Sequence, residues 1–340
     1  MITKNEKYYM WSVVLVILLF ILAASTLLAL SSGELKIGLK EVIKLIIGKG
    51  DKASVNSMLI NQIRMPRVLL GIAVGGALSL SGVILQGIYR NPLVEPYTLG
   101  ISGGASLGVA FVIVLGLQLK LGEFMLPLAG FVGAALIVFL VYFLSSGKGN
   151  VSIERMLLTG VMVSFIASSA MMILMALSDT ENLHGIIFWT MGSLDEPNIS
   201  LIWLTMIISI TGLIFSCFFA KDLNALRLGR EKAMHLGIRT NLVTKTLFFL
   251  ASLLAGVCVA VAGVIGFVGL IIPHILRQIV GSDYRILLIS SFLLGGSFLV
   301  LSDLVARTII SPNELPIGVI TGIIGGTIFI IMMNSKKKKK

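Results

Sequence analysis

The side chains that could do chemistry in this sequence are few and widely separated. Its three histidines and two cysteines form no group at the spacing of a metal site, and Cys217 and Cys258 both fall inside apolar runs. The chain has no GxxxxGKS/T loop of the kind that cradles nucleotide phosphates. Arg155, Asp303 and Arg307 lie at the ends of apolar segments. We therefore expect no catalytic residue, metal or cofactor on this chain, and interpret each histidine as a loop or interface residue.

The composition explains this scarcity. Of the 340 residues, 56% are hydrophobic and 13% are charged, whereas a soluble domain carries about a quarter charged residues. The sequence therefore predicts an all-α polytopic membrane protein, with residues 1–340 as one domain. The formal charge of +11 would suit nucleic acid, but the basic residues lie mostly between apolar runs and in the tail Lys336–Lys340. We expect them to face membrane lipid, with no nucleic-acid partner.

Ten segments are candidates for crossing the membrane. Nine are close to the roughly 20 apolar residues that a spanning helix needs, and they are Trp11–Leu30, Pro66–Ile88, Tyr97–Leu117, Phe124–Leu144, Arg155–Leu177, Ile199–Phe219, Leu242–Ile265, Arg285–Val305 and Pro316–Met333. The tenth, Gly266–Gly281, is shorter and contains Pro273. Both tails carry lysines, so both are expected in the cytoplasm, which requires an even number of crossings. The prediction is ten transmembrane helices, one of them short.

The first external loop conflicts with this orientation, because it holds five lysines between residues 36 and 52. Lys36, Lys40 and Lys44 recur every four residues and share one helical face. This pattern predicts a helix that lies in the outer membrane interface. The external loop Ser178–Asn198 fits the outside, since it holds acidic residues but no lysine or arginine. It is also long enough for a short helix.

Glycine is frequent, with 36 residues, and the spacing of several suits helices that pack closely in lipid. These are Gly71/Gly75, Gly100/Gly104/Gly108 and Gly318/Gly322/Gly326. The segment RNPLVEP (Arg90–Pro96), which precedes the Gly100/Gly104/Gly108 set, carries two prolines and cannot continue a helix. Irregular backbone at the membrane boundary needs protein or water to satisfy it. Such broken segments beside a pathway are typical of transporters.

The largest inside loop is Lys221–Asn241. It is expected to form two short helical pieces separated at Leu228 and Gly229, with Gly237 ending the second. Its apolar residues within a basic setting favour a docking element for a cytoplasmic partner. The alternative is a solvated linker.

Four blocks of this sequence, in the same order, closely resemble the FecCD-type permeases. These are membrane subunits of ATP-driven importers for iron–siderophores, haem and cobalamin. The blocks are Arg64–Gly108, Leu228–Gly237, Gly266–Arg277 and Leu301–Ile330. The ten-helix subunit of that family agrees with the crossing count, which was made from the residues alone. The lysine-rich first loop and the lysine tail depart from the family pattern.

The resemblance implies the partners of the chain. Two copies would form a homodimer with the path at their interface, in the cytoplasmic (inner) membrane. Two cytoplasmic ATPase subunits would bind ATP and Mg, so this chain itself would not be an enzyme. An extracytoplasmic substrate-binding protein would dock outside and deliver the metal chelate.

The resemblance also implies roles for particular residues. Arg64, Arg67 and Arg307 would receive acidic residues of the binding protein, which agrees with the preference of arginine for carboxylates; the alternative is snorkelling to lipid headgroups. The ATPase-coupling residues would be Leu228, Gly229, Arg230, Glu231, Ala233, His235, Leu236 and Gly237. The cytoplasmic gate would be formed by Asn91, Leu93, Ile153, Glu154 and Leu158.

Two other functions stay open from the sequence. An ion-coupled carrier could act without an ATPase, although such carriers usually hold carboxylates near mid-membrane and this sequence places none there. A structural subunit of an electron-transfer complex is disfavoured by the lack of paired histidines. Small and hydroxyl-bearing residues are expected to line the path and suit a bulky ligand delivered by another protein. Examples are Ser164, Ser168, Ser169 and Met171.

Overall fold

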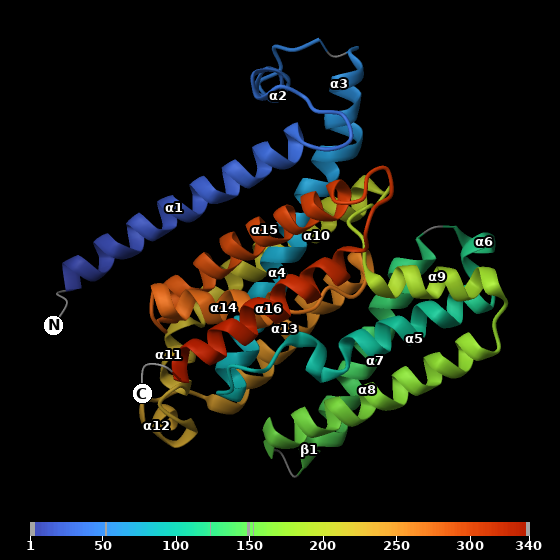
Figure 1. Cartoon of the computed structure of the whole chain (residues 1–340). Coiled ribbons are helices and arrows are strands. Elements are labelled where there is room, and N and C mark those ends of the chain that lie inside the picture. The colour runs from blue at the N-terminus through green and yellow to red at the C-terminus, as the bar shows by residue number, and fades with distance from the viewer. Residues whose placement is uncertain (1–3, 52, 123, 148–149, 152, 338–340) are drawn as a thin grey trace.

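The computed structural model describes residues 4–51, 53–122, 124–147, 150–151 and 153–337. Lys52, Lys148 and the last three lysines, which enter the charge argument, lie outside the described residues. Within them, eight helices are long and apolar enough to cross a membrane, and two shorter apolar helices accompany them (Figure 1). The eight are α1 (Lys4–Ser31), α4 (Met65–Tyr89), α7 (Met125–Ser145), α8 (Ile153–Ala176), α10 (Ile199–Phe218), α13 (Thr240–Ala262), α15 (Tyr284–Thr308) and α16 (Ile317–Lys337).

The prediction of a single short helix is wrong, because two helices are short: α5 (Ile101–Val114) and α14 (Val268–Ile279). The segment predicted as one span, 97–117, is divided at Gly100, which has a left-handed φ of 84°. A 3-10 turn, η2 (Pro96–Leu99), precedes this glycine. The 14 residues of α5 cover only about 21 Å at 1.5 Å per residue. This is less than the roughly 30 Å of a bilayer core.

The remaining elements lie in the connections. The first long connection forms α2 (Leu39–Ile46), α3 (Val55–Met58) and a π-helical turn, η1 (Leu59–Arg64). The expected interfacial helix is confirmed as a helix over Lys40 and Lys44, whereas Lys36 precedes it. The other connecting elements are α6 (Leu117–Leu121), α9 (Thr180–Met191), α11 (Ala220–Leu226), α12 (Arg230–His235) and the two-residue strands β1 (Ser146–Gly147) and β2 (Asn150–Val151). Within the described residues, this short antiparallel strand pair differs from the prediction of an all-α protein.

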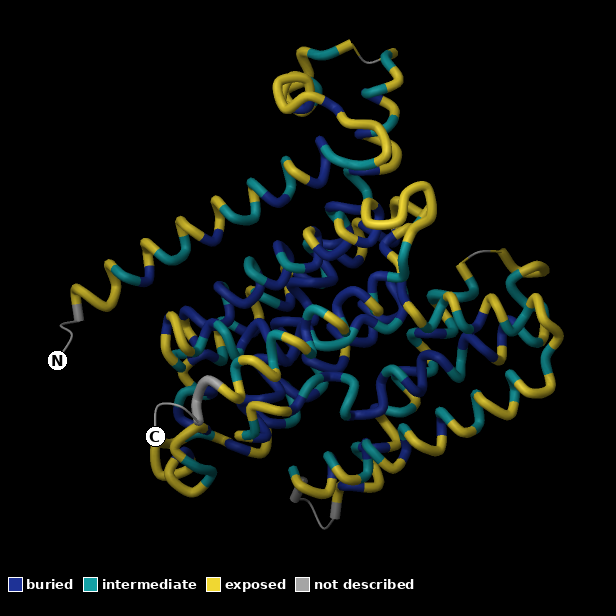
Figure 2. Tube along the Cα trace, in the orientation of Figure 1, coloured by how far each residue is buried: buried dark blue, intermediate teal, exposed yellow. Residues whose placement is uncertain are grey.

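Helix α4 forms the centre of the bundle and packs against α15, α13, α10 and α14. In the most apolar 18-residue stretch of the segment that includes α4, 89% of the residues are buried. The corresponding fraction is 22% for α1 and 17% for α8. Figure 2 shows the same contrast between the buried centre and the partly exposed outer helices. Glycines permit the closest approaches: a Cβ on Gly82 would overlap the carbonyl oxygen of Gly269 in α14, and one on Gly104 would overlap that of Gly133 in α7. Of the predicted glycines, Gly75 in α4, whose Cβ would overlap the carbonyl oxygen of Gly295, and Gly104 in α5 are confirmed as close-packing positions. Gly322 in α16 is not, because a Cβ there would meet nothing within 4 Å.

The connections divide between the two ends of the bundle (Figure 1). One end, called the terminal end below, carries the first residues of α1, the last residues of α16, and α11 and α12. The opposite end, called the far end, carries α2, α9 and the connection between α15 and α16. An ion pair of 3.2 Å between Lys7 and Asp283 attaches the start of α1 to the start of α15.

Candidate functional site

Arg67 is buried at the far end behind two carboxylates. It is 6% exposed and donates to both carboxylate oxygens of Glu314, at 2.9 and 2.7 Å. A third oxygen, from Asp195, lies 3.3 Å from its guanidinium. The two acidic side chains are 48% and 72% exposed. The acids therefore stand between this arginine and the solvent.

Arg64 and Arg307 hold the last turn of α1. Arg64 donates to the carbonyl oxygen of Leu30 at 2.6 Å, and Arg307 donates to that of Ala29 at 3.3 Å. Both carbonyls belong to the four at a helix end that lack intrahelical partners, and a cation there also complements the helix dipole. Arg307 also forms an ion pair of 2.8 Å with Asp303, one helical turn away.

The three predicted docking arginines thus lie at one end of the bundle, as expected, but they face the protein and not the solvent. Their exposed fractions are between 4% and 9%. Such burial argues against snorkelling to lipid headgroups. Sequence reasoning missed the acidic partners Asp195, Asp303 and Glu314. The spacing of Asp303 and Arg307 on one helix could have indicated one pair, whereas the other acids lie in distant connections.

A cavity of about 330 Å³ adjoins these arginines at the far end. It lies between α9, the end of α15 and the start of α16. Aromatic and charged side chains line it together, among them Trp189, Arg307 and Glu314.

The RNPLVEP segment makes a sharp turn at the terminal end, called the gate turn below (Arg90–Pro96). Arg90 ends α4 with a left-handed φ of 48°, a conformation uncommon for a residue other than glycine. The Asn91 side chain accepts a hydrogen bond from the Leu93 N–H at 2.9 Å, and Leu93 is 53% exposed. The turn therefore presents an apolar side chain outward.

Side chains in and just after the gate turn satisfy backbone N–H groups of the segment before α14. The Glu95 carboxylate accepts from the Phe267 N–H at 3.3 Å, and the Tyr97 hydroxyl accepts from the Ile265 N–H at 3.2 Å. The expectation that irregular backbone would be satisfied by other parts of the protein is confirmed for Ile265 and Phe267 before α14. In the gate turn itself, the Leu93 N–H is satisfied within the same turn, by Asn91. These two broken segments are far apart in sequence and adjacent in the fold.

The other predicted gate residues lie on the first turns of α8. Ile153 is partly buried, whereas Glu154 and Leu158 are exposed. Helix α8 packs against η2, and a Cβ on Gly160 would lie 2.9 Å from the Cα of Leu99. The structure thus places the start of α8 beside the segment that follows the gate turn.

The loop predicted to couple to an ATPase forms two short helices, as expected. Helices α11 and α12 are separated around Gly229, which has a φ of 109°, and Gly237, with a φ of 83°, follows α12. Leu228 and Leu236 are 58% and 63% exposed, while Ala233 is fully buried. Around them, Arg230 is partly exposed and Glu231 and His235 are exposed. Arg230 donates to the side chain of Asn241.

A cavity lined by hydroxyl groups lies along α8. Its volume is about 240 Å³, and Tyr97, Thr98, Ser164 and Ser168 contribute to its wall. Of the four residues predicted to line a path, Ser164 and Ser168 therefore do line a cavity. Met171 packs instead in a small apolar cluster with residues of α5 and α9.

The residues from 17 to 335 match the model of the FecCD transport family. The chain belongs to this family. A hemin transport system permease protein, HmuU, of Yersinia pestis is 37% identical over 285 residues, covering 82% of this chain and 84% of the relative. A vitamin B12 import system permease protein, BtuC, of Klebsiella pneumoniae is 40% identical over 276 residues, covering 81% and 82%.

The fold also matches a solved structure. An ABC transporter assigned to the metal-chelate type, in an inward-facing conformation, aligns with a TM-score of 0.82 and 29% identity over 95% of this chain and 99% of the other. As a FecCD permease, the chain is a multi-pass membrane subunit of an ABC importer. ATP is hydrolysed on the partner ATPase, and the permease carries no cofactor of its own.

Proposed function

We propose that this permease, as one domain, imports a metal chelate of the iron–siderophore, haem or cobalamin class in the cytoplasmic membrane. The observation that carries the proposal is the similarity over more than four fifths of the chain to permeases named for hemin and vitamin B12. The hydroxyl-lined cavity along α8 supports a path for a bulky ligand. Two copies of the chain, two ATPase subunits and a substrate-binding protein form the working complex.

The direct test is transport by the purified complex in proteoliposomes. Uptake of one of the three chelates, delivered by the binding protein, is expected only with ATP on the ATPase side. Uptake by this chain alone, without an ATPase, would instead favour an ion-coupled carrier. No uptake of any of the three chelates by an ATP-hydrolysing complex would contradict the substrate class.

The terminal end faces the cytoplasm in this proposal. Basic side chains gather there, which accords with the excess of lysine and arginine on the cytoplasmic side of membrane proteins. Examples are Lys7, Arg90, Arg227 and Arg285. Acidic side chains such as Asp195 and Glu314 surround the far end, where the binding protein would dock.

The coupling role of α12 is supported by the exposed leucines that flank it, Leu228 and Leu236, within a charged setting. An apolar face of this kind fits a cleft on another protein. Deletion of Arg230–Leu236 is expected to release the ATPase during purification. Because a deletion can disturb folding, Leu228→Asp and Leu236→Asp test the same surface, with Leu119→Asp at the far end as the matched control. Full co-purification with unchanged stability would reject the role.

Binding-protein docking requires the far-end arginines to exchange partners. Carboxylates of the binding protein would take the place of Glu314 and Asp195 on Arg67. Arg67→Glu is expected to abolish the stimulation of ATP hydrolysis by the binding protein, and Lys120→Glu on α6 is the matched control. Arg67 is a better single probe than Arg64 or Arg307, because those two also hold α1. Unchanged stimulation in Arg67→Glu would reject this residue's docking role.

The homodimer is supported by the apolar side chains that α8 exposes. In the single chain, only 17% of the residues in its most apolar 18-residue stretch are buried. A cysteine at Ile166, which is 68% exposed, is expected to cross-link two copies in a Cys217→Ser, Cys258→Ser background. A cysteine at Phe20 of α1, which is 74% exposed, is the control that faces lipid. Cross-linking at Phe20 alone would place the interface elsewhere.

A further inference from the structure

A pocket at the terminal end is lined by three arginines. It has a volume of about 260 Å³, and its wall contains Arg90, Arg227 and Arg277. These come from the end of α4, the loop between α11 and α12, and the last turn of α14. The rest of the wall is formed by Gln86, Gly87, Pro92, Ser282 and Tyr284. The pocket therefore lies where the gate turn, the coupling loop and two core helices meet.

Hydrogen bonds hold two of the guanidinium groups in place. Arg277 donates to the side-chain oxygen of Gln86 at 2.5 Å, and Gln86 in turn donates to the carbonyl oxygen of Gly269 at 3.0 Å. Arg227 donates to the carbonyl oxygen of Ser282 at 2.7 Å. In these bonds Arg277 and Arg227 each use one of the five N–H donors that a guanidinium carries. Oriented donors on two elements therefore border the same space.

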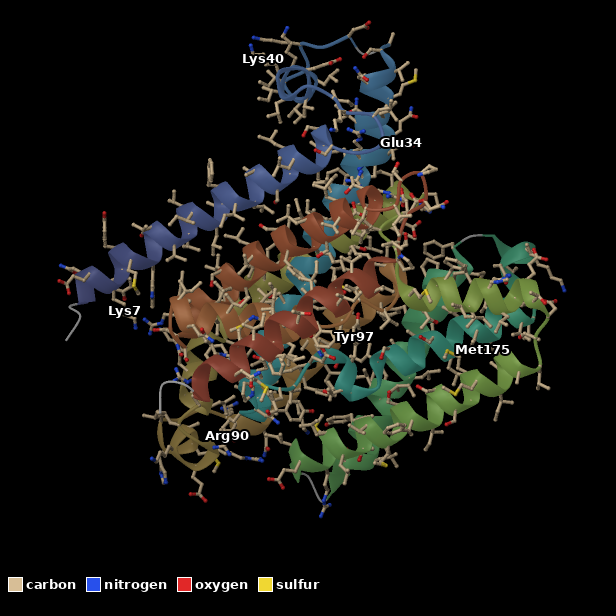
Figure 3. The ribbon with its side chains drawn as sticks, in the orientation of Figure 1. Lys7, Glu34, Lys40, Arg90, Tyr97 and Met175 are labelled. Carbon is tan, nitrogen blue, oxygen red and sulfur yellow. The ribbon has the colours of Figure 1, made fainter. Side chains whose placement is uncertain are left out.

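Arg90 brings the third element to the pocket. Figure 3 labels this side chain at the terminal end of the bundle. Its Nη1 lies 3.5 Å from the position that a Cβ on Gly229 would occupy, so the end of α4 and the coupling loop are in close proximity. The left-handed backbone of Arg90 directs the chain into the gate turn at this point.

The pocket concentrates positive charge without an acidic residue in its described wall. Arg227 and Arg277 border the same pocket, and like charges placed in this way repel each other. The neighbouring carboxylate, Asp283, already accepts hydrogen bonds from Asn224 at 2.9 Å and Lys7 at 3.2 Å. Arg277 is partly buried and Arg90 and Arg227 are exposed, and a bound anion relieves the repulsion among their like charges. Arginine is suited to phosphate, because its planar fork matches two oxygens of the anion.

We propose that this pocket binds a phosphate-bearing anion, supplied by a phospholipid headgroup or by a soluble phosphate. The pocket lies at the ends of α4 and α14 and at the start of α15, which places it at the level of the headgroups. The pocket volume is large enough for one phosphate group and several water molecules, since one water molecule occupies about 30 Å³. The bound anion joins the gate turn to the coupling loop and stabilises the arrangement in which they are in contact.

The test uses the purified full-length chain in detergent, with phosphatidylglycerol, phosphatidylcholine and inorganic phosphate as probes. Native mass spectrometry measures retention of each probe, and thermal unfolding measures its stabilisation. The double variant Arg90→Asn, Arg227→Gln removes two charges, and asparagine tolerates the left-handed backbone at position 90. Arg285→Gln is the control, because this exposed arginine at the same end does not line the pocket.

Phosphatidylglycerol or phosphate is expected to bind the wild-type chain and raise its Tm, with phosphatidylcholine weaker. The double variant should lose this binding by about tenfold or more, because two guanidiniums with charge-assisted hydrogen bonds are removed. Arg285→Gln should keep it. Retention of phosphatidylglycerol alone identifies the lipid as the source, and equal binding of inorganic phosphate identifies a soluble anion.

Two results would overturn the proposal. One is equal binding of the probes by wild type and a double variant whose elution profile and ligand-free Tm are unchanged. The other is that neither phosphatidylglycerol nor inorganic phosphate binds the wild-type chain. If the double variant then also loses the co-purifying ATPase, the arginines bind an acidic side chain of that partner. The assay measures neither transport nor substrate binding. Its result therefore tests the anion pocket even if the proposed import function is wrong.

Discussion

Arg67 near the start of α4 is bound by both carboxylate oxygens of Glu314, a residue 247 positions further along the chain, at 2.9 and 2.7 Å. This paired geometry is the strongest form of the arginine–carboxylate contact. It fastens the connection between α15 and α16 onto the central helix. An arginine predicted to receive another protein's carboxylate thus already holds one of its own.

Removing that internal carboxylate is expected to help the binding protein. Glu314→Gln weakens the competing pair and should raise binding-protein affinity by about fivefold or more, since a fully exposed ion pair contributes up to about 1 kcal/mol and the Arg67 side of this pair is buried. Biolayer interferometry with the reconstituted complex measures the affinity. Glu181→Gln on α9 removes an exposed acid at the same end and is the control. A lower affinity in Glu314→Gln would mean that Glu314 assists docking.

The contact between α4 and α14 is expected to tolerate no added methyl group at Gly82. Gly82→Ala would place its Cβ against the carbonyl oxygen of Gly269, so the two helices must separate. Overpacking of this kind typically costs about 1–3 kcal/mol. Thermal unfolding in detergent measures the loss. Gly256→Ala in α13 is the control, because its Cβ would meet neighbours only at 3.8 Å or more; equal stability of both variants would contradict the close packing.

Asp283 is expected to stabilise the terminal end in a pH-dependent way. Partial burial raises the pKa of this carboxyl, but hydrogen bonds from Asn224, the Arg285 N–H and Lys7, with the charge of Lys7, lower it overall. A lowered pKa in the folded state means that the stabilisation is present above the unfolded value, about 3.9, and is lost as the pH falls through the folded value.

The corresponding measurement compares wild type with Asp283→Asn, which keeps a side chain able to cap α15. The difference in Tm should be largest near pH 7 and should shrink below about pH 4, near the unfolded pKa. A difference that stays constant down to pH 3 would show that the charge of Asp283 contributes nothing.

Orientation is tested by cysteine labelling on intact cells. In a Cys217→Ser, Cys258→Ser background, a membrane-impermeant maleimide should modify Lys120→Cys, which is exposed in α6 at the far end. It should modify Lys232→Cys, which is exposed in α12, only after the cells are opened. Labelling of Lys232→Cys in intact cells would reverse the proposed orientation.

The sequence by itself determined the family, nine of the ten apolar helices and the division of the coupling loop around Gly229. The bounds of these helices were right to within a few residues, except that α1 begins at Lys4, seven residues before the predicted Trp11. These features depend on local information, because apolar runs, prolines and glycines act on the backbone where they stand. Gly237 was likewise placed correctly at a helix end from its residue type alone. The family assignment needed only the order of four sequence blocks.

Only the tertiary structure decided the features that depend on distant partners. The segment 97–117 reads as one continuous apolar span, but the structure divides it at Gly100, and Tyr97 before the division accepts a hydrogen bond from the distant Ile265. The three far-end arginines look exposed in sequence, yet Arg67 faces an acid 247 positions away. Likewise, the arginines around the anion pocket come from three elements that meet only after folding. Hydropathy records how apolar a segment is, but the partner of a charge is set by packing in three dimensions.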